Sequence, residues 1–267
     1  TFGFLPTWMV GKTRVYGREV SHLIFLGVET EETGKLIWDF QSNKINNESY
    51  LRQKEETKNQ GGKNILGIKL FKDDKLTKLL SSENYRKNLV EEVGRVVEEE
   101  EFDGVNVDFE YQGNPTKILE KNFLTFLEEL RQAEVGEISV DVFANTVIKG
   151  SATEIEELVS KVDYLVVMAY DFHRPGVDYA GSVAPLGSKV GERNITEVVE
   201  RYLNLQLNKD KLVLAYPLYG YEWKTYTDEF ESQIKRGWYQ MASWNRVKNL
   251  IKEKKIEVNW DELSMTP

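Results

Sequence analysis

The chain contains no cysteine, only two histidines, and fewer basic than acidic side chains. The absence of cysteine excludes disulfides and thiolate metal sites. His22 and His173 stand far apart in the sequence, and two isolated imidazoles do not predict a metal site. The 35 basic and 44 acidic residues give a net charge of -9. This balance argues against a nucleic-acid partner, which requires basic surface.

Long hydrophobic runs are also missing, since no stretch approaches the roughly 20 apolar residues that cross a membrane. We therefore expect no membrane partner. Hydrophobic residues make up 40% of the 267 positions and charged residues 30%, as in an ordinary globular protein. This length allows a substantial core, and no linker-like change of composition interrupts it. We predict one domain over residues 1–267.

Short apolar runs alternate with amphipathic segments along the chain. Leu89, Val93, Val96 and Val97 recur at helical spacing. The same spacing is found within residues 123–130, 155–159, 195–202 and 247–251. Strands are predicted to begin near residues 1, 21, 63, 104, 137, 162 and 211. Such alternation indicates an α/β fold, either an open doubly wound sheet or a closed (β/α)₈ TIM barrel.

The segment 102–110 carries polar and apolar side chains in strict alternation. The polar set is Asn106, Asp108 and Glu110, and the apolar set is Val105, Val107 and Phe109. Alternate side chains of a strand share a face, so the polar groups point one way and the apolar groups the other. A solvent-facing edge strand is the structural alternative. Buried carboxylates are costly, so their repetition on one face favours a catalytic explanation.

The position of these polar residues also favours the barrel over the open sheet. In a barrel, catalytic side chains lie where the strands end. An open sheet usually has a glycine-rich phosphate loop after its first strand, and residues 3–6 offer none. We predict a TIM barrel whose eighth strand is missing from the 267 residues. Residues 256–261 are expected to begin the approach to that strand.

Three motifs resemble family 18 glycoside hydrolases, the group of chitinases and endo-N-acetylglucosaminidases. Residues 103–110 are similar to the Asp-Gly-x-Asp-x-Asp-x-Glu signature of the fourth strand. Residues 168–171, Met-Ala-Tyr-Asp, resemble the Met-x-Tyr-Asp of the sixth strand. Residues 216–220, Tyr-Pro-Leu-Tyr-Gly, resemble the Pro-x-Tyr-Gly of the seventh strand. They follow in the family's order, so the resemblance covers nearly the whole chain.

The resemblance implies a retaining mechanism in which the N-acetyl group of the substrate is the nucleophile. Glu110 would act as acid and base on the departing oxygen and on water. Asp108 would bind the acetamido N–H and stabilise the oxazolinium intermediate. Its charge should favour the protonated form of Glu110. Tyr170 would align the acetamido carbonyl, and Asp171 would bind the neighbouring sugar.

Further residues receive binding or supporting roles. Asn106 is expected to contact substrate or to donate from its amide to Asp108. Aromatic side chains at strand ends are expected to stack on sugars, with Trp8, Tyr219 and Trp223 ranked first. Asp103 and Met168 are predicted to support the site structurally. The mechanism requires no cofactor and no metal.

Two departures from the family pattern affect the reading of function. Asn106 stands where the family commonly has a second Asp, so proton sharing with Asp108 cannot take its usual form. Residues 67–70, Gly-Ile-Lys-Leu, replace the family's Ser-x-Gly-Gly. The preferred function is hydrolysis of β-1,4 bonds next to N-acetylglucosamine in chitin or peptidoglycan. An inactive chitinase-like lectin therefore remains an alternative. An endo-β-N-acetylglucosaminidase acting on N-glycans is the other alternative.

The first residues read at once as a strand, without a recognisable signal peptide. We take this start as that of a processed or trimmed chain. The resemblance implies a secreted or cell-surface protein whose ligand is a glycan containing N-acetylglucosamine.

Overall fold

Seven strands follow one another in a single curved sheet, in the order β1-β2-β4-β5-β6-β7-β8. This computed structural model describes all residues except 14–18, 39–46, 150–151, 190–192, 255–256 and 267. The ladders from β1 to β6 are parallel. The seven strands are β1 (Phe2–Pro6), β2 (His22–Thr30), β4 (Lys63–Leu70), β5 (Gly104–Phe109), β6 (Glu137–Phe143), β7 (Tyr164–Met168) and β8 (Leu212–Ala215). All seven predicted strands are confirmed.

Helices follow the strands, and the five that cover residues 83–99, 117–132, 152–161, 195–203 and 244–254 lie where the apolar spacing predicted them, whereas the other three were not predicted. They are α1 (Asn47–Asn59), α2 (Asp73–Ser81), α3 (Glu83–Glu99), α4 (Lys117–Gln132), α5 (Thr146–Lys149), α6 (Ala152–Lys161), α7 (Ile195–Leu203) and α8 (Trp244–Lys254). Short 3₁₀ turns are η1 (Thr7–Met9) and η3 (Lys209–Lys211). Side-chain caps explain three helix starts, because Ser82, Thr116 and Asn194 each accept a hydrogen bond from a backbone N–H of the first turn.

The chain divides into two compact units, which are described separately. Unit 1 consists of Thr1–Val142, Glu156–Val166 and Asp210–Val213. Unit 2 consists of Phe143–Ile155, Val167–Lys209 and Leu214–Pro267. The expectation of a single domain over residues 1–267 stays a prediction.

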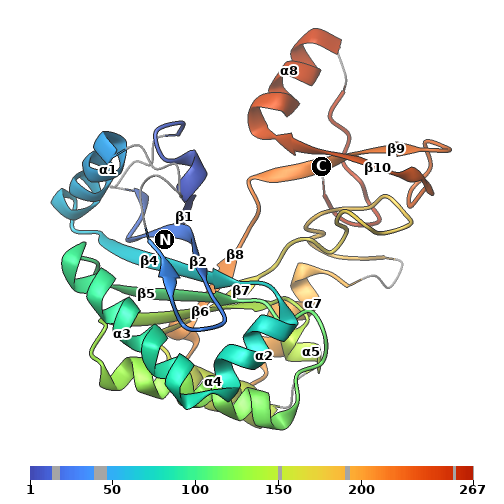
Figure 1. Ribbon diagram of the computed structural model, residues 1–267. Coiled ribbons are helices and arrows are strands. Elements are labelled where there is room, and N and C mark those ends of the chain that lie inside the picture. The colour runs from blue at the N-terminus through green and yellow to red at the C-terminus, as the bar shows by residue number, and fades with distance from the viewer. Residues whose placement is uncertain (14–18, 39–46, 150–151, 190–192, 255–256, 267) are drawn as a thin grey trace. The chain divides into compact units, whose positions relative to one another are not determined.

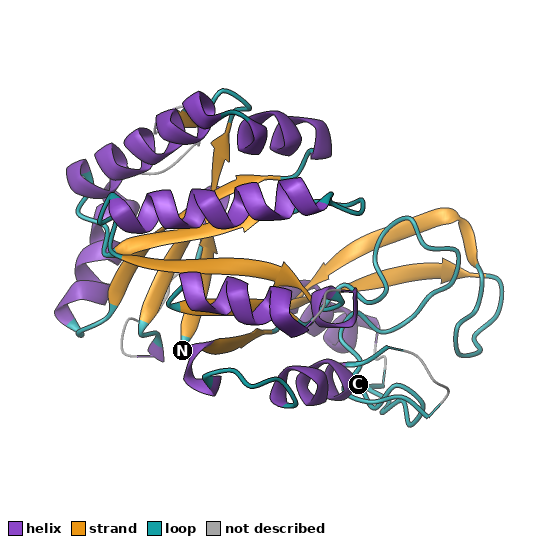
Figure 2. Ribbon diagram, turned by 90° about the horizontal axis from the view of Figure 1, so that it is seen from below, coloured by secondary structure: helices purple, strands orange, loops and turns teal. Residues whose placement is uncertain are grey.

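In unit 1, helices cover the outer face of the strands. Figures 1 and 2 show α2, α3 and α4 lying along β4, β5 and β6. Phe109 of β5 stacks on Phe126 of α4 at 5.8 Å between ring centroids, and Phe123 adjoins both rings. On β2, Phe25 packs edge-on against Tyr50 of α1. The apolar set of β5 thus faces helices, which leaves its polar set for the inner face.

A charged and aromatic floor closes the inner face of unit 1 where the strands begin. Glu137 accepts a hydrogen bond from His22 at 2.9 Å and forms an ion pair with Lys63. The rings of Phe2 and Tyr164 meet edge-on at 5.0 Å, which brings the starts of β1 and β7 together. The sheet is therefore strongly curved at this end.

The sheet remains an open half-barrel within the described residues, since no ladder there joins β8 to β1. Residues 256–261 were expected to begin the approach to an eighth strand, and residue 256 lies outside the described residues. Residues 257–260 form no strand, and a turn closed by the isolated bridge between Asp261 and Thr266 follows them. The approach to an eighth strand stays a prediction.

Three strands were not predicted. The short β3 (Leu36–Ile37) pairs antiparallel with β2. In unit 2, β9 (Tyr219–Thr225) and β10 (Ile234–Ser243) form an antiparallel ribbon that leads into α8, as Figure 1 shows. Most of β10 is exposed, so it lacks the apolar run that revealed the buried strands.

One buried ion pair joins α3 to α4 and gives a test of this packing. Arg86 donates to both carboxylate oxygens of Glu129, and its Nη1 donates to the Leu80 carbonyl at 2.8 Å. We expect Arg86→Gln to lower the free energy of unfolding by about 3 kcal/mol, because an acid is left partly buried without its partner. Urea denaturation followed by circular dichroism measures the loss.

The matched control is Arg95→Gln on the exposed side of α3. Arg95 pairs with Glu92 and Glu99, but its side chain is 44% exposed. Exposed pairs contribute about 0–1 kcal/mol, so this variant should stay close to the parent. Equal losses in both variants would contradict the role given to Arg86.

Candidate active site

Two polar side chains of β5, a strand of unit 1, are buried. Asn106 is 0% and Asp108 is 4% exposed. Glu110 comes directly after the strand and is only partly buried, and its Oε2 accepts a hydrogen bond from Gln112 Nε2 at 3.1 Å. The predicted alternation of β5 is confirmed. It places an enclosed acid and a partly exposed acid next to each other at the strand's carboxyl end.

The amide of Asn106 makes its contacts with β6. Its Nδ2 donates to Asp141 Oδ1 at 2.8 Å and to Ser139 Oγ at 3.0 Å. The expectation that this amide donates to Asp108 was therefore wrong. Within the described part of the chain, Asp108 Oδ1 has no hydrogen-bond partner. We call Asn106, Asp108, Glu110 and Asp141 the acidic cluster.

Asp141 was missed by sequence reasoning. It is buried and shares the inner face of β6 with Ser139, two residues earlier. The alternation Ser-Val-Asp-Val in residues 139–142 was the available signal, because it repeats the polar-apolar pattern of β5. No motif drew attention to it.

The buried acids of the cluster resist ionisation. Burial raises the pKa of Asp108 well above its usual range, and the charges of Asp141 and Glu110 raise it further. Burial also raises the pKa of Asp141, while the hydrogen bond from Asn106 acts in the opposite direction. The amide thus favours the ionised form of Asp141 over that of Asp108.

Lys69 of β4 places a cation beside the acidic cluster. It lies opposite Asp108 in one ladder and opposite Glu29 in the other. Its ammonium group forms an ion pair with Glu29 at 2.9 Å, and its charge lowers the pKa of Asp108. Lys69 is one of the residues by which the chain departs from the family's Ser-x-Gly-Gly pattern.

Trp8 lies next to this cation. The Lys69 Nζ is 5.5 Å from the centroid of the Trp8 ring, and the indole is 50% exposed. Gly27, with a φ of 116°, makes room for the indole, because a Cβ at position 27 would lie 3.1 Å from the Trp8 ring. An exposed ring near enclosed acids is the arrangement expected of a sugar-stacking residue.

Asp103 lies at the opposite end of β5 from the acidic cluster. Its Oδ2 accepts a hydrogen bond from the backbone N–H of Asn64 at 2.8 Å. Its backbone joins β4 and β6 as well, through Asn64 and Glu137. These contacts hold strand starts together and agree with a structural role.

In unit 2, a group of aromatic side chains surrounds Asp171, and we call it the tyrosine cluster. Asp171 accepts hydrogen bonds from the hydroxyl groups of Tyr219 at 3.0 Å and Tyr221 at 3.2 Å. Tyr170 meets the Tyr219 ring edge-on at 6.3 Å, and Trp223 adjoins Tyr221 at 5.4 Å. Tyr170 and Asp171 from one motif and Tyr219 from another thus come together.

The geometry at Asp171 is unusual and is held by its partners. Its φ of 57° lies in the left-handed region of the backbone, which residues other than glycine seldom adopt. Burial and the charge of Asp171 raise the pKa of Tyr219, and the same causes raise the pKa of Tyr221 to about 12. Both phenols therefore stay protonated as donors. Met168 is buried three residues earlier on β7.

Tyr239 belongs to this cluster but was not predicted. It lies opposite Trp223 in the β9–β10 ladder, and its ring also meets Tyr221. The residue was missed because β10 itself was not recognised.

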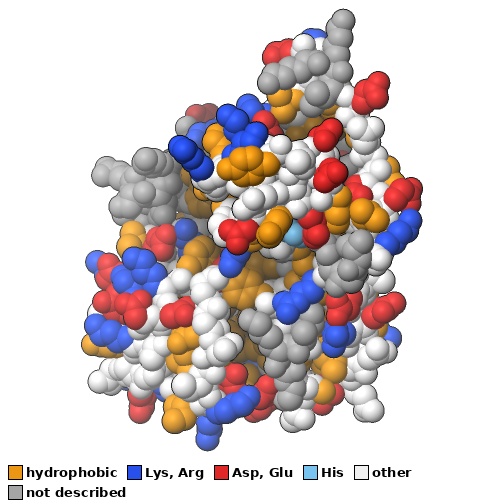
Figure 3. Space-filling view, turned by 90° about the vertical axis from the view of Figure 1, so that its right-hand side faces the viewer, with side chains coloured by type: hydrophobic (Ala, Val, Ile, Leu, Met, Phe, Trp, Pro, Cys, Tyr) orange, Lys and Arg blue, Asp and Glu red, His pale blue; other side chains and the backbone are white. Residues whose placement is uncertain are grey.

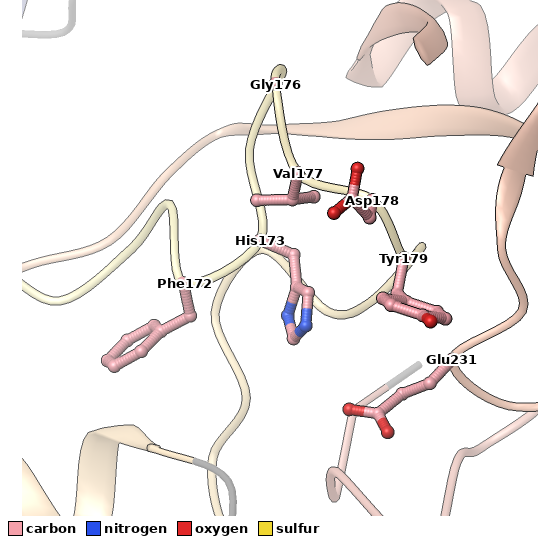
Figure 4. A pocket seen from close by; sticks show the side chains of 7 residues that line it. All are labelled: Phe172, His173, Gly176, Val177, Asp178, Tyr179 and Glu231. Carbon is pink, nitrogen blue, oxygen red and sulfur yellow. The ribbon is translucent and has the colours of Figure 1, made fainter. Parts of the chain in front are cut away.

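Unit 2 also contains an open pocket of about 530 Å³, lined in part by the loop that follows Asp171. Figure 4 shows the side chains that line it: Phe172, His173, Gly176, Val177, Asp178, Tyr179 and Glu231. His173 Nδ1 donates to the Ser182 carbonyl at 3.2 Å. Gly181 makes room for that imidazole, because a Cβ there would lie 2.4 Å from the ring.

The surface agrees with the composition. Figure 3 shows acidic and basic side chains interspersed over one face of the molecule. Among the described residues, no group of three or more potential ligands could hold a metal ion. No helix in the same part of the chain is long and apolar enough to cross a membrane.

A curved parallel sheet with outer helices, and acids at the carboxyl end of a central strand, defines the class of TIM-barrel proteins. Within that class, the chain belongs to family 18 of the glycosyl hydrolases, whose sequence profile matches residues 2–267. The fold prediction and the resemblance are both confirmed.

Relatives in sequence agree with the family. The probable chitinase 2 of Drosophila melanogaster is 26% identical over 168 residues, which are 60% of this chain and 34% of that protein. The putative sporulation-specific glycosylase YdhD of Bacillus subtilis is 28% identical over 158 residues, 57% of this chain and 35% of that protein. The matches thus span about a third of the length of these relatives.

Solved structures show the same fold. The class V chitinase of Nicotiana tobaccum, in complex with NAG4, superposes with a TM-score of 0.83 at 18% identity, over 99% of this chain and 82% of that chain. The group IV chitinase of Ostrinia furnacalis gives 0.81 at 19% identity, over 99% of this chain and 81% of that chain.

The acidic cluster predicts an inverse dependence of stability on pH. A buried acid whose pKa is raised by folding binds its proton more tightly in the folded state. Stability is then greatest below the unfolded pKa of about 4 and falls as pH rises toward the folded pKa. Asp108→Asn removes this cost. The variant should match the parent near pH 3 and be more stable at pH 7 and above.

Denaturation with urea from pH 3 to 9 measures this difference. Glu91→Gln, an exposed acid of α3, is the control and should follow the parent at every pH. An Asp108→Asn variant that is less stable than the parent at pH 8 would show that Asp108 is ionised and favourably solvated in the folded protein.

Proposed function

We propose that this protein is a retaining glycoside hydrolase that cleaves β-1,4 bonds next to N-acetylglucosamine in chitin or peptidoglycan-like glycans. Family membership supports a glycan substrate. The observation that carries the proposal is the pairing of an enclosed acid with an unoccupied acceptor oxygen, Asp108, and a partly exposed acid, Glu110.

Glu110 is the acid and base of the proposed reaction. Glycosidic cleavage needs a carboxylic acid that protonates the departing oxygen. Partial exposure suits this role, because the group must reach both the scissile bond and an incoming water. After cleavage, the Glu110 carboxylate takes a proton from that water, which opens the oxazolinium intermediate with retention of configuration.

Asp108 receives the role of a charge stabiliser. An acetamido N–H that donates to Asp108 Oδ1 would satisfy the one oxygen that has no partner among the described residues. A carboxylate at this place favours the positive charge that spreads over the oxazolinium ring. The N-acetyl carbonyl itself supplies the nucleophile, as substrate-assisted hydrolysis requires.

The remaining roles concern binding. We assign Tyr170 to the alignment of the acetamido carbonyl and Asp171 to the sugar next to the scissile bond. Trp8, Tyr219 and Trp223 offer ring faces or edges for sugar stacking. Asn106, in contrast, is fully buried against β6 and is better suited to support the cluster than to touch substrate.

Several chitinases among the structural neighbours were solved with N-acetylglucosamine oligomers. That precedent supports oligomers of N-acetylglucosamine as first test substrates. The class of chitinase-like binding proteins is a second candidate, since a chitinase-like protein of Glossina morsitans morsitans is also a relative, 23% identical over 189 residues, which are 58% of this chain and 43% of that protein. We further propose that the protein acts outside the cell, without a nucleic-acid or membrane partner.

Glu110→Gln tests the proposal directly. The amide cannot give a proton to the leaving oxygen, so turnover should fall by roughly 10² to 10⁴. Release of a fluorophore from N-acetylglucosamine oligomers measures turnover, and calorimetry measures binding of the same oligomers. Glu91→Gln serves as the control and should keep the parent's rate.

The outcomes separate the candidate functions. Binding by the parent without any release would support the binding protein and would defeat the hydrolase. Release that survives in Glu110→Gln would show that another group is the acid. A panel of chitin oligomers, peptidoglycan and N-glycans then identifies the substrate class, including the endo-β-N-acetylglucosaminidase alternative.

A further inference from the structure

The hydrogen bond between Asn106 and Asp141 crosses from β5 to β6 inside unit 1. It joins a residue of the family's motif to an acid that the motif does not contain. Both side chains are buried, and Asp141 is 6% exposed. An acid is seldom enclosed in this way without a functional or electrostatic reason.

Asp141 and Asp108 are close enough to affect each other's charge. Asn106 and Asp108 share the inner face of β5, and β6 pairs with β5 so that Asn106 lies opposite Ser139. The same register brings Asp141, two residues further along, toward the level of Asp108. After burial, the charge of Asp141 is the main cause that raises the pKa of Asp108.

Two enclosed carboxylates whose charges interact across neighbouring strands cannot readily both be ionised. The only donor that contacts either of them among the described residues is Asn106, and it donates to Asp141. The amide thus stabilises negative charge on Asp141. Asp108, which lacks a donor, is the partner that keeps the proton.

We propose that Asp141 is a positioning residue that shares one proton with Asp108 and thereby controls when Asp108 is ionised. This inference rests on the proposed function of Asp108. It also gives a reason for Asn106, which stands where the family commonly has an acid: its amide donates to an acid on the neighbouring strand.

The proposed proton transfer balances within the pair. In the free protein, Asp108 holds the proton and Asp141 is ionised. An acetamido N–H that donates to Asp108, followed by positive charge on the sugar, favours the Asp108 carboxylate. One proton then leaves Asp108 and one binds Asp141, so the pair keeps a charge of -1 throughout.

The other charged groups near Asp108 and Asp141 in unit 1 cannot take the place of Asp141 as the proton acceptor. Glu110 at the end of β5 raises the pKa values of both buried acids. Lys69 on β4 lowers that of Asp108, but its ammonium group is already paired with Glu29 of β2. Among the described residues, Asp141 is therefore the buried acid to which the proton of Asp108 can pass.

Asp141→Asn tests the proposal through the acid limb of the pH profile of kcat/KM. In the parent, Asp141 ionises first and then accepts the proton that Asp108 gives up. In the variant, Asp108 must lose its proton to solvent without help from Asn106. We expect the acid limb to move to higher pH by about one unit or more, with a smaller change in KM.

Other roles of Asp141 predict other results. If its charge only repels that of Asp108, the acid limb should move to lower pH in Asp141→Asn. If Asp141 merely packs against β5, the limb should not move. Either result would overturn the proposal.

Two further variants complete the design. Asn106→Asp combined with Asp141→Asn returns the acid to β5 and places the amide on β6, and it should restore the parent's acid limb. Ser139→Ala is the matched control. It removes the other contact of the Asn106 amide without changing any charge, so the acid limb should stay in place. Failure of the double variant to restore the limb would count against proton sharing.

Infrared spectroscopy tests the pair without any turnover. The parent at neutral pH should show the carbonyl band of a protonated carboxyl group, and Asp108→Asn should abolish it. In Asp141→Asn the same band should disappear at lower pH than in the parent, because the repelling charge is gone. Absence of the band in the folded parent would refute the inference even if hydrolysis is observed, and an inactive protein with the band would refute only the hydrolase proposal.

Discussion

The burial of carboxyl groups inside unit 1 is the constraint on which the acidic cluster depends. A carboxylate loses most of its hydration in such a place, and the loss must be offset by donors, by a cation or by a proton. All three means are present here. Asn106 donates to Asp141, Lys69 provides a cation, and burial raises the pKa of Asp108, which favours its protonated form.

The tyrosine cluster of unit 2 meets the same constraint in another way. Asp171 receives two phenol hydroxyl groups, from Tyr219 and Tyr221, and these donors stabilise its charge. Burial raises the pKa of Tyr219, and the charge of Asp171 raises it further. The two acids differ in their neighbours: Asp171 accepts hydrogen bonds from two phenols, whereas Asp108 has acids beside it and suits a charge that appears only with a ligand.

Much of the fold could be predicted from sequence because buried strands and amphipathic helices leave strong periodic patterns. The polar face of β5 followed from the alternation at Asn106, Asp108 and Glu110. The residues of the neighbouring strand that contact this polar face could not be predicted in the same way. A period of two tells which residues share a side of one strand, but it does not tell which residue of the next strand lies opposite. Asp141 and the true direction of the Asn106 amide depend on that register. Tyr239 was missed for a related reason, since the exposed β10 carries no apolar run.

The departures of this chain from the family pattern all change the charge on the inner face of the unit 1 sheet, and their effects on Asp108 are therefore connected. Asn106 of β5 stands where the family commonly has an acid, and the buried acid Asp141 lies on β6. Lys69 adds a cation on β4, where the family has glycine, and Glu29 on β2 pairs with it. A cation alone would fix Asp108 as a permanent carboxylate, and a second acid alone would keep it permanently neutral. Together they hold Asp108 between the two states, so that a weak donor such as an acetamido N–H can decide its charge. Each substitution weakens the motif when taken singly, but the set preserves the property that the proposed reaction requires.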